Sequence, residues 1–230
     1  MTTRRSATQR PSVVAVIASR ADLDRAMWMR NPPDLFELRL DRLAGIADQL
    51  ENKLASVRAP LIITARHPQE GGAHKLSLRQ RRDLLTRFLP HAHYVDVELR
   101  SASALRSLLT LAKQKKIRRI ISFHNFKSTP PPRVLMANGH AAKACGANIF
   151  KVATRTDTPL QLARLLDFIT RTDIDLPVGA MGIGKLGAIS RVLLARAGSA
   201  LVYASLTAAT DIEGQLSLEQ LRSLGIASRY

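Results

Sequence analysis

Cysteine, aromatic residues and long apolar runs are scarce in this sequence, and each scarcity excludes a class of protein. Cys145 is the single cysteine, so an internal disulfide and a cysteine metal cluster cannot form, and we expect a packed thiol there rather than a nucleophile. One Trp and three Tyr give few platforms on which nucleic acid bases could stack. No apolar run reaches the roughly 18 residues of a membrane-spanning helix, and the N-terminal MTTRRSATQR lacks the apolar segment of a secretory signal. We therefore expect a soluble, cytoplasmic protein.

Acidic residues are also few, because 18 Asp and Glu stand against 35 Lys and Arg and give a formal charge of +17. That excess favours an anionic partner, either a nucleic acid or a small molecule. The basic residues are scattered in short clusters, so a nucleic acid partner is not favoured and much of the excess is expected to be solvated surface. Residues 1–11 form a basic stretch, where we expect a short flexible arm before one domain over residues 12–230.

Apolar, β-rich runs alternate eight times with segments of helical periodicity. The predicted strands are Val13–Ser19, Leu35–Asp41, Pro60–Arg66, Tyr94–Arg100, Arg119–Phe126, Ala147–Thr154, Pro177–Ile183 and Ala200–Leu206. The predicted helices are Ala21–Arg30, Ile46–Val57, Leu78–Leu89, Ala104–Lys116, Arg133–Cys145, Leu160–Thr170, Ala188–Ala197 and Ser217–Leu224. Ser77 and Thr158 are helix start signals, and Gly146 is a stop signal.

Strand followed by helix, repeated at about one unit per 25 to 30 residues, implies parallel pairing and predicts a single-domain (β/α)8 TIM barrel of the α/β class. A doubly wound open sheet is the structural alternative. The residues after the first predicted strand, VIASRADLD, contain no glycine-rich dinucleotide fingerprint, which disfavours the open sheet.

Charged and polar residues occupy one side of five predicted strands, alternating with apolar residues. Successive residues of a strand face opposite sides, so the apolar set should face the helices and the charged set the barrel axis. Such barrels place their active sites at the C-terminal ends of the strands. The residues expected to converge there are Glu37, Arg39, Asp41, Arg66, Glu98, His124 and Lys151.

Lys151 stands at the centre of the apolar run ANIFKVA. Burial and the like charges of Arg39 and Arg66 would disfavour its ammonium form, and a neutral amine could attack a carbonyl, as in Schiff-base catalysis. His124 would serve as a proton shuttle because its unperturbed pKa lies near neutrality, with Glu98 to orient it. The alternatives are a buried Lys–Glu pair for Lys151 and a structural role for His124.

Short motifs occur in a fixed order between Val13 and Leu221 and together are highly specific. They are Glu37-x-Arg39-x-Asp41, Thr64-x-Arg66 with Glu70-Gly71-Gly72, Asp96-x-Glu98, Ser122-x-His124-x-Phe126 with Thr129-Pro130, Lys151-x-Ala153, Gly184-Lys185-x-Gly187-x-x-Ser190-Arg191 and Gly214-Gln215. In this order they resemble the type I 3-dehydroquinate dehydratases. The resemblance implies a homodimeric TIM barrel, with no cofactor and no metal, that dehydrates 3-dehydroquinate to 3-dehydroshikimate in the shikimate pathway to aromatic amino acids.

The same resemblance implies roles for particular residues. Lys151 would form an imine with the ring ketone, His124 would move the protons, and Glu98 would support His124. Arg191 would pair with the substrate carboxylate, a role that suits a guanidinium group. The remaining implied substrate contacts are Glu37, Arg39 and Arg66 at ring hydroxyls, Phe126 and Met181 as apolar walls, and Asp211 and Gln215 on a loop that closes over the ring.

That loop departs from the family pattern, because Asp211-Ile212-Glu213-Gly214-Gln215 stands where the family has Ser-x-Pro-Gly-Gln. Two acids would repel an anionic substrate unless both point outward, so we expect weaker closure. Two other functions stay open. One is a catalytically weakened barrel that binds nucleic acid or other anions through its basic surface, and the other is a different imine-forming barrel enzyme such as an aldolase.

Overall fold

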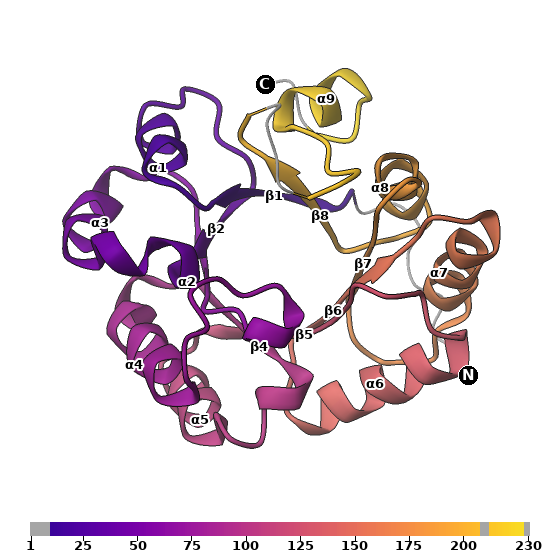
Figure 1. Cartoon of the computed structure of the whole chain (residues 1–230), viewed down its shortest axis with the longest axis horizontal. Helices are drawn as coiled ribbons and strands as arrows, with labels where there is room; N and C mark the ends of the chain where they lie inside the picture. Colours follow the sequence, from indigo (N-terminus) through magenta and orange to yellow (C-terminus); the bar gives the residue numbers. More distant parts are fainter. Residues whose placement is uncertain (1–9, 208–211, 228–230) are drawn as a thin grey trace.

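The structure, a computed structural model, describes residues 10–207 and 212–227 and forms a ring of parallel strands surrounded by helices (Figure 1). The strands are β1 (Ser12–Ile17), β2 (Leu35–Arg39), β3 (Leu61–Thr64), β4 (Tyr94–Glu98), β5 (Arg118–Asn125), β6 (Ile149–Arg155), β7 (Val178–Ile183) and β8 (Leu201–Ser205). They pair in the order β7-β6-β5-β4-β3-β2-β1-β8. The amide of Ala200 donates to the carbonyl of Val178 at 2.8 Å, which joins the two ends of the sheet. The predicted (β/α)8 TIM barrel is confirmed.

Helices follow the strands and lie on the outside of the ring (Figure 1). The α-helices are α1 (Arg20–Met27), α2 (Leu40–Leu43), α3 (Ala47–Lys53), α4 (Leu78–Phe88), α5 (Arg106–Gln114), α6 (Pro132–Ala144), α7 (Pro159–Arg171), α8 (Gly187–Arg196) and α9 (Leu218–Ser223). Short 3-10 helices are η1 (Ala44–Ile46), η2 (Leu54–Ser56), η3 (Pro68–Glu70), η4 (Leu89–His91) and η5 (Leu99–Ser101). Ser77 and Thr158 each form a reciprocal capping box with the residue three positions on, so both predicted starts are confirmed.

Several strands end earlier than predicted, and this changes where two charged residues lie. β2 ends at Arg39, so Asp41 belongs to the short helix α2, and β3 ends at Thr64, so Arg66 follows the strand. The carboxylate of Asp41 accepts from the backbone amides of Arg66 and Ala73, which fixes the chain beyond β3. The predicted helix over residues 46–57 is also wrong in extent, because its regular α-helical part is α3 alone.

The strands separate two apolar layers. Outward-facing side chains such as Phe36, Val97 and Phe150 pack beneath the helices in a large buried cluster. Inside the ring, a smaller cluster fills the N-terminal part of the barrel with one or two residues from most strands: Val14, Leu35, Ile62, Ile120, Ile149 and Leu201. Burial of these apolar groups stabilises the ring and leaves its C-terminal part for polar side chains.

Three further expectations concern the N-terminal arm, Cys145 and membrane-spanning helices. The flexible arm predicted for residues 1–11 lies almost wholly outside the described residues. Cys145 is exposed at the end of α6, so the expected packed thiol is wrong. Within residues 10–207 and 212–227, none of the helices has the length and apolar character needed to span a bilayer.

The edge-on contact between Phe150 of β6 and Phe168 of α7 yields a test of the outer core. The ring centroids lie 6.4 Å apart at 89°, and both side chains are buried. Phe150→Ala is expected to lower the free energy of unfolding by about 3–5 kcal/mol, because it leaves a cavity. Chemical denaturation measures this. Leu78→Ala at the exposed start of α4 is the control and should change it by less than about 0.5 kcal/mol, and equal losses would contradict this account of the core.

Candidate active site

Lys151 projects from the middle of β6 into the barrel and lies between two carboxylates. Its Nζ donates to Oε1 of Glu37 at 3.2 Å and to Oδ2 of Asp96 at 3.0 Å, and it lies 3.9 Å from the ring centroid of Tyr203. The side chain is 4% exposed. The site therefore contains a buried amine that its neighbours hold in one position.

These contacts correct the expected surroundings of Lys151. The sequence predicted that neighbouring arginines would disfavour its ammonium, whereas its direct contacts are carboxylates and an aromatic face, which stabilise positive charge. The buried Lys–Glu pair that stood as the alternative is present, with Glu37 as the partner. A reaction that uses the free amine must therefore pass its proton to a group nearby.

Arg66 binds the same carboxylates from the other side. Its guanidinium donates to Asp96 at 2.8 and 3.3 Å and to the hydroxyl of Ser122 at 2.7 Å, and it lies 3.6 Å from Glu37. Burial alone would raise the pKa of Asp96, but the charges of Arg66 and Lys151 reverse this and hold that pKa well below its usual value. Asp96 is therefore ionised at neutral pH.

His124, near the end of β5, is paired with Glu70 of η3. Its Nδ1 lies 2.9 Å from Oε2 of Glu70, and its backbone amide donates to the same oxygen at 3.0 Å. Burial, then the charges of Arg66 and Lys151, lower the pKa of His124 well below its ordinary value, so the imidazole is neutral at neutral pH. The contact uses Nδ1 and leaves Nε2 as the nitrogen that can exchange a proton with a bound molecule.

The predicted partner of His124 was Glu98, and here the structure differs. Glu98 accepts hydrogen bonds from the amide of His67 at 2.8 Å, from Arg66 at 3.3 Å and from Arg81 of α4. Arg81 is 1% exposed and also donates to the carbonyl of Ala65 at 2.7 Å. Glu98 thus anchors the segment after β3 and acts on Glu70 only through its charge.

The surroundings of Glu70 bring the pKa of its carboxyl group close to neutrality. Burial, followed by the negative charge of Glu98, raises its pKa to about 7, while the charge of Arg66 opposes the rise. At neutral pH it can therefore exist with or without its proton beside Nδ1 of His124. A pair of this kind can pass a proton to and from a bound molecule without a large cost in either direction.

Other predicted substrate residues line the same end of the barrel. Arg39 makes a bidentate pair with Asp41 at 2.8 and 3.0 Å and donates to the carbonyl of Gly71 at 3.0 Å. Phe126 is 44% exposed, and its ring covers Gly71. Met181 of β7 is buried inside the barrel. Within the described residues, these groups form a rim around Lys151 and His124.

Arg191 of α8 differs from Arg39 and Arg66 because, among the described residues, its hydrogen bonds go to backbone carbonyls. Its Nη1 donates to Gly182, Gly187 and Gly214 at 2.7–2.9 Å, and its Nε donates to Tyr203 at 3.2 Å. Burial lowers its pKa to about 10. A buried guanidinium held by neutral acceptors keeps its charge uncompensated, which favours an anion beside it.

The loop that follows β8 is described from Ile212 onward. Glu213 points to Arg155, whose Nη2 lies 3.0 Å from its carboxylate, and its backbone carbonyl accepts from Gly184 at 2.9 Å. Gln215 follows Gly214, which contacts Arg191. Asp211, which the sequence placed among the substrate contacts, lies outside the described residues. The repulsion expected from Glu213 is reduced, because its carboxylate is paired with Arg155, which it shares with Asp157.

Three residues of the site were missed at the sequence level. Glu70 stood in the quoted Glu-Gly-Gly motif without a role, and Asp96 stood beside Glu98 in the same motif. Tyr203 lies in the last predicted strand at a position that faces the barrel interior. The alternation of side chains between the two faces of a strand could have identified Asp96 and Tyr203 as facing the barrel interior. Glu70 lies in a 3-10 turn, where this alternation does not apply.

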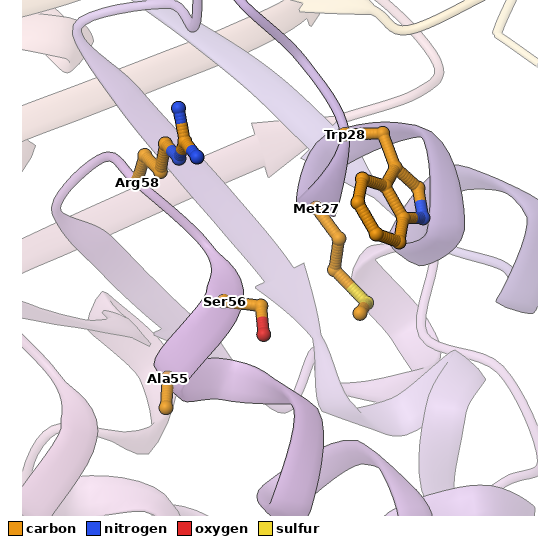
Figure 2. A pocket seen from close by; sticks show the side chains of 5 residues that line it. All are labelled: Met27, Trp28, Ala55, Ser56 and Arg58. Carbon is orange, nitrogen blue, oxygen red and sulfur yellow. The ribbon is translucent and has the colours of Figure 1, made fainter.

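A separate hollow of about 290 Å³ opens on the outer surface between the end of α1 and η2 with the residues that follow it (Figure 2). It is lined by Met27, Trp28, Ala55, Ser56 and Arg58, and Figure 2 shows the Met27 and Ser56 side chains facing one another across it. It brings no acid, base or nucleophile together. Among the residues that the structure describes, no group of three or more His, Cys, Asp and Glu is arranged to hold a metal ion.

Comparison with known proteins places this geometry in a family. The family described as Type I 3-dehydroquinase matches residues 13–225. A 3-dehydroquinate dehydratase of Pyrococcus abyssi is 35% identical, over 82% of this chain and 85% of the relative. The crystal structure of the 3-dehydroquinate dehydratase of Geobacillus kaustophilus aligns with a TM-score of 0.82 at 26% identity, over 94% of this chain and 90% of the other. A type I 3-dehydroquinate dehydratase of Clostridium difficile, 23% identical, shares the fold with a TM-score of 0.84, over 95% and 92% of the two chains.

The raised pKa of Glu70 yields a test by thermodynamic linkage. Between its ordinary pKa of 4.5 and its folded pKa of about 7, the folded protein binds more protons than the unfolded chain, so stability falls as pH rises through this window. Glu70→Gln does not titrate there. Urea denaturation from pH 4.5 to 8 should show the free energy of unfolding of the native protein declining relative to the variant, by up to about 3 kcal/mol. His124 is retained in both proteins, and a constant difference across the window would contradict the assignment.

Proposed function

Because this chain belongs to the type I 3-dehydroquinase family, we propose that it dehydrates 3-dehydroquinate to 3-dehydroshikimate through an imine at Lys151. The observation that carries the proposal is the buried Lys151 amine, fixed between Glu37 and Asp96 close to the His124–Glu70 pair. Such an amine can attack a ketone, and the resulting iminium withdraws electrons from the neighbouring carbon. This step belongs to the shikimate pathway to aromatic amino acids.

Groups at the site supply and accept the protons that imine formation requires. The Lys151 ammonium first gives a proton to Glu37, and the free amine then forms a bond to the ketone carbon while the π electrons move to oxygen. That oxygen takes up two protons, which originate from the ammonium, and leaves as water. An iminium with one N–H remains, so the charge of the buried cluster is the same before and after this step.

His124 then acts on the carbon skeleton. Its neutral Nε2 removes a proton from the carbon next to the iminium, and the enamine that results expels the ring hydroxyl, which takes the proton from the imidazolium as it departs. Glu70 at Nδ1 holds the ring in orientation and stabilises the imidazolium between these two transfers. Hydrolysis of the conjugated iminium returns the Lys151 amine and releases the product.

Arg191 supports the choice of a carboxylate substrate. Within the described residues its charge is contacted by carbonyl oxygens and by no carboxylate, so a carboxylate of the substrate would supply the missing counter-charge. We assign the ring hydroxyls to Glu37, Arg39 and Arg66, the apolar walls to Phe126 and Met181, and a contact above the ring to Gln215. Glu98 acts by anchoring Arg66 and Arg81 rather than by touching His124.

The assembly and the cell compartment belong to the proposal as well. A cytoplasmic homodimer agrees with the family, and the exposed apolar side chains Leu160, Ile189 and Leu193 on α7 and α8 offer a surface for a second copy. Among the functions left open by the sequence, the family match favours the dehydratase over a basic nucleic acid-binding barrel and over an aldolase.

Trapping with borohydride tests the role of Lys151. Incubation of the protein with 3-dehydroquinate and borohydride should add one reduced ligand mass to the peptide that contains Lys151, as measured by mass spectrometry. Lys151→Ala should lose the adduct and nearly all turnover. Lys53→Ala, which alters a surface lysine paired with Asp24, is the matched control and should keep both. An unmodified Lys151 in a protein with ligand demonstrably bound would refute the assignment.

Variants of three residues separate the proton shuttle from the anchor. His124→Ala should block turnover yet still allow the Lys151 adduct to form. Glu70→Gln should lower kcat by about 10–100-fold, because the imidazolium loses a charged partner. Glu98→Gln should instead lower the free energy of unfolding by several kcal/mol, because it disrupts a buried ion pair with Arg66 and Arg81. Steady-state kinetics and denaturation of the same preparations measure both effects, and a Glu98 variant of native stability with a lower kcat than the Glu70 variant would reverse the two roles.

A further inference from the structure

Tyr203 of β8 is a buried phenol inside the barrel that the mechanism above does not use. It is 4% exposed and packs with Val14 and Met181 in the inner apolar cluster, whereas its chain neighbours Val202 and Ala204 belong to the outer cluster beneath α9. The side chain thus crosses the interior at the level of the site. Its backbone carbonyl accepts from Arg191, which ties the same residue to the anion-binding arginine.

The ring of Tyr203 faces the amine, and within the described part of the chain its hydroxyl has no hydrogen-bond partner. The Lys151 Nζ lies 3.9 Å from the ring centroid, so the phenol oxygen, one bond beyond the ring, lies within a few bond lengths of the amine. Among the described residues, Oη of Tyr203 is one of few buried side-chain polar atoms without a hydrogen-bond partner. An unpaired buried donor destabilises a protein, and a phenylalanine would fill the same space without that cost. The hydroxyl is therefore placed to meet a group that arrives with a ligand.

The hydroxyl is available as a donor rather than as an anion. Burial, followed by the charges of Glu37 and Asp96, raises the pKa of Tyr203 well above its ordinary value, so the phenol keeps its proton throughout the working pH range. Both carboxylates are engaged with Lys151 and Arg66. A ligand oxygen that becomes negative beside Nζ is the acceptor that the phenol can serve.

We propose that the Tyr203 hydroxyl donates a hydrogen bond to the carbonyl oxygen of the substrate while Lys151 attacks the carbonyl carbon. The inference rests on the proposed function and deepens it by assigning a donor to the oxygen that imine formation expels. As the C–N bond forms, the π electrons of the carbonyl move to oxygen, and a fixed donor stabilises the charge that develops there. The phenol keeps its own proton, and the two protons that leave with the water come from the Lys151 ammonium, so the step balances without another reactant.

The ring contributes separately from the hydroxyl. An aromatic face stabilises a nearby cation, and the nitrogen of Lys151 is positively charged both as the resting ammonium and as the iminium. Tyr203→Phe removes the hydroxyl and keeps the face, whereas Tyr203→Leu removes both. Comparison of the two variants therefore separates the effect of the hydroxyl from the effect of the aromatic ring.

The test measures the rate of imine formation in a single turnover, with saturating 3-dehydroquinate, borohydride quenching and mass spectrometry of the Lys151 peptide. Tyr203→Phe is expected to slow this rate by about 10–100-fold, the range for one hydrogen bond to a charged group, with KM within about twofold of native. Its denaturation midpoint should be unchanged or higher, because an unpaired buried donor is gone. Tyr203→Leu should be slower still.

Tyr94→Phe is the matched control, because it removes a hydroxyl that contacts Arg118 at the exposed N-terminal end of β4, away from Lys151, and it should leave the rate unchanged. A native rate in Tyr203→Phe would overturn the proposal and leave the phenol a filler of space. A raised KM with a native rate at saturation would also overturn it, since the hydroxyl would then bind another oxygen of the ring. Loss of both rate and stability would assign it a structural role. These outcomes are distinct from failure of the proposed function, in which the native protein itself would form no Lys151 adduct.

Discussion

The contact of Lys151 with Glu37 and Asp96 inside the barrel is the interaction on which the rest of the site depends. A buried ammonium is costly without partners, and each of its partners is a buried carboxylate that needs a cation of its own. Arg66 meets that need for Asp96 and Glu37, and Arg81 meets it for Glu98. Among the described residues, the network of ion pairs connected to Lys151 and its neighbours thus holds four cations, Arg39, Arg66, Arg81 and Lys151, and four carboxylates, Glu37, Asp41, Asp96 and Glu98, with Glu70 and Arg191 buried beside it. This local balance explains how a chain of net charge +17 can bury so many ionised groups at one place.

The balanced cluster also sets the properties of the groups around it. The positive charges of Arg66 and Lys151 add to burial in keeping His124 neutral, and the negative charge of Glu98 adds to burial in raising the pKa of Glu70 to about 7. A neutral base and a half-ionised acid therefore lie side by side because the cluster beneath them is fixed. Arg191 lies outside this balance, and its unmatched charge favours an anion near α8, as the proposed binding of the substrate carboxylate requires.

Many residues of this site were predictable from the sequence, because successive side chains of a strand always point to opposite faces of the sheet. The alternation of apolar and charged residues located Glu37, His124 and Lys151 on the inner face, and the repeat of strand and helix predicted the barrel. This alternation does not predict contacts made by residues that lie beyond the end of a strand. Glu98 faces the site, but a side chain from α4 reaches its carboxylate, and helical periodicity does not reveal how deep an arginine extends. Glu70 reaches His124 from a turn, where no periodic rule fixes the direction of a side chain.

The loop after β8 shows that a departure from a family pattern can leave the underlying contacts intact. Gly214 has φ of +76°, and a Cβ atom added there would lie 2.4 Å from the carbonyl of Gly184, so this position requires glycine. The backbone of Gly214 meets Arg191, and the backbone of Glu213 meets Gly184, so main-chain contacts hold this part of the loop. The acidic side chain of Glu213 turns to Arg155. Replacing proline by glutamate therefore changes the rigidity of the chain before the glycine, whereas the contacts that hold Gly214 beside Arg191 and Gly184 are made by backbone atoms.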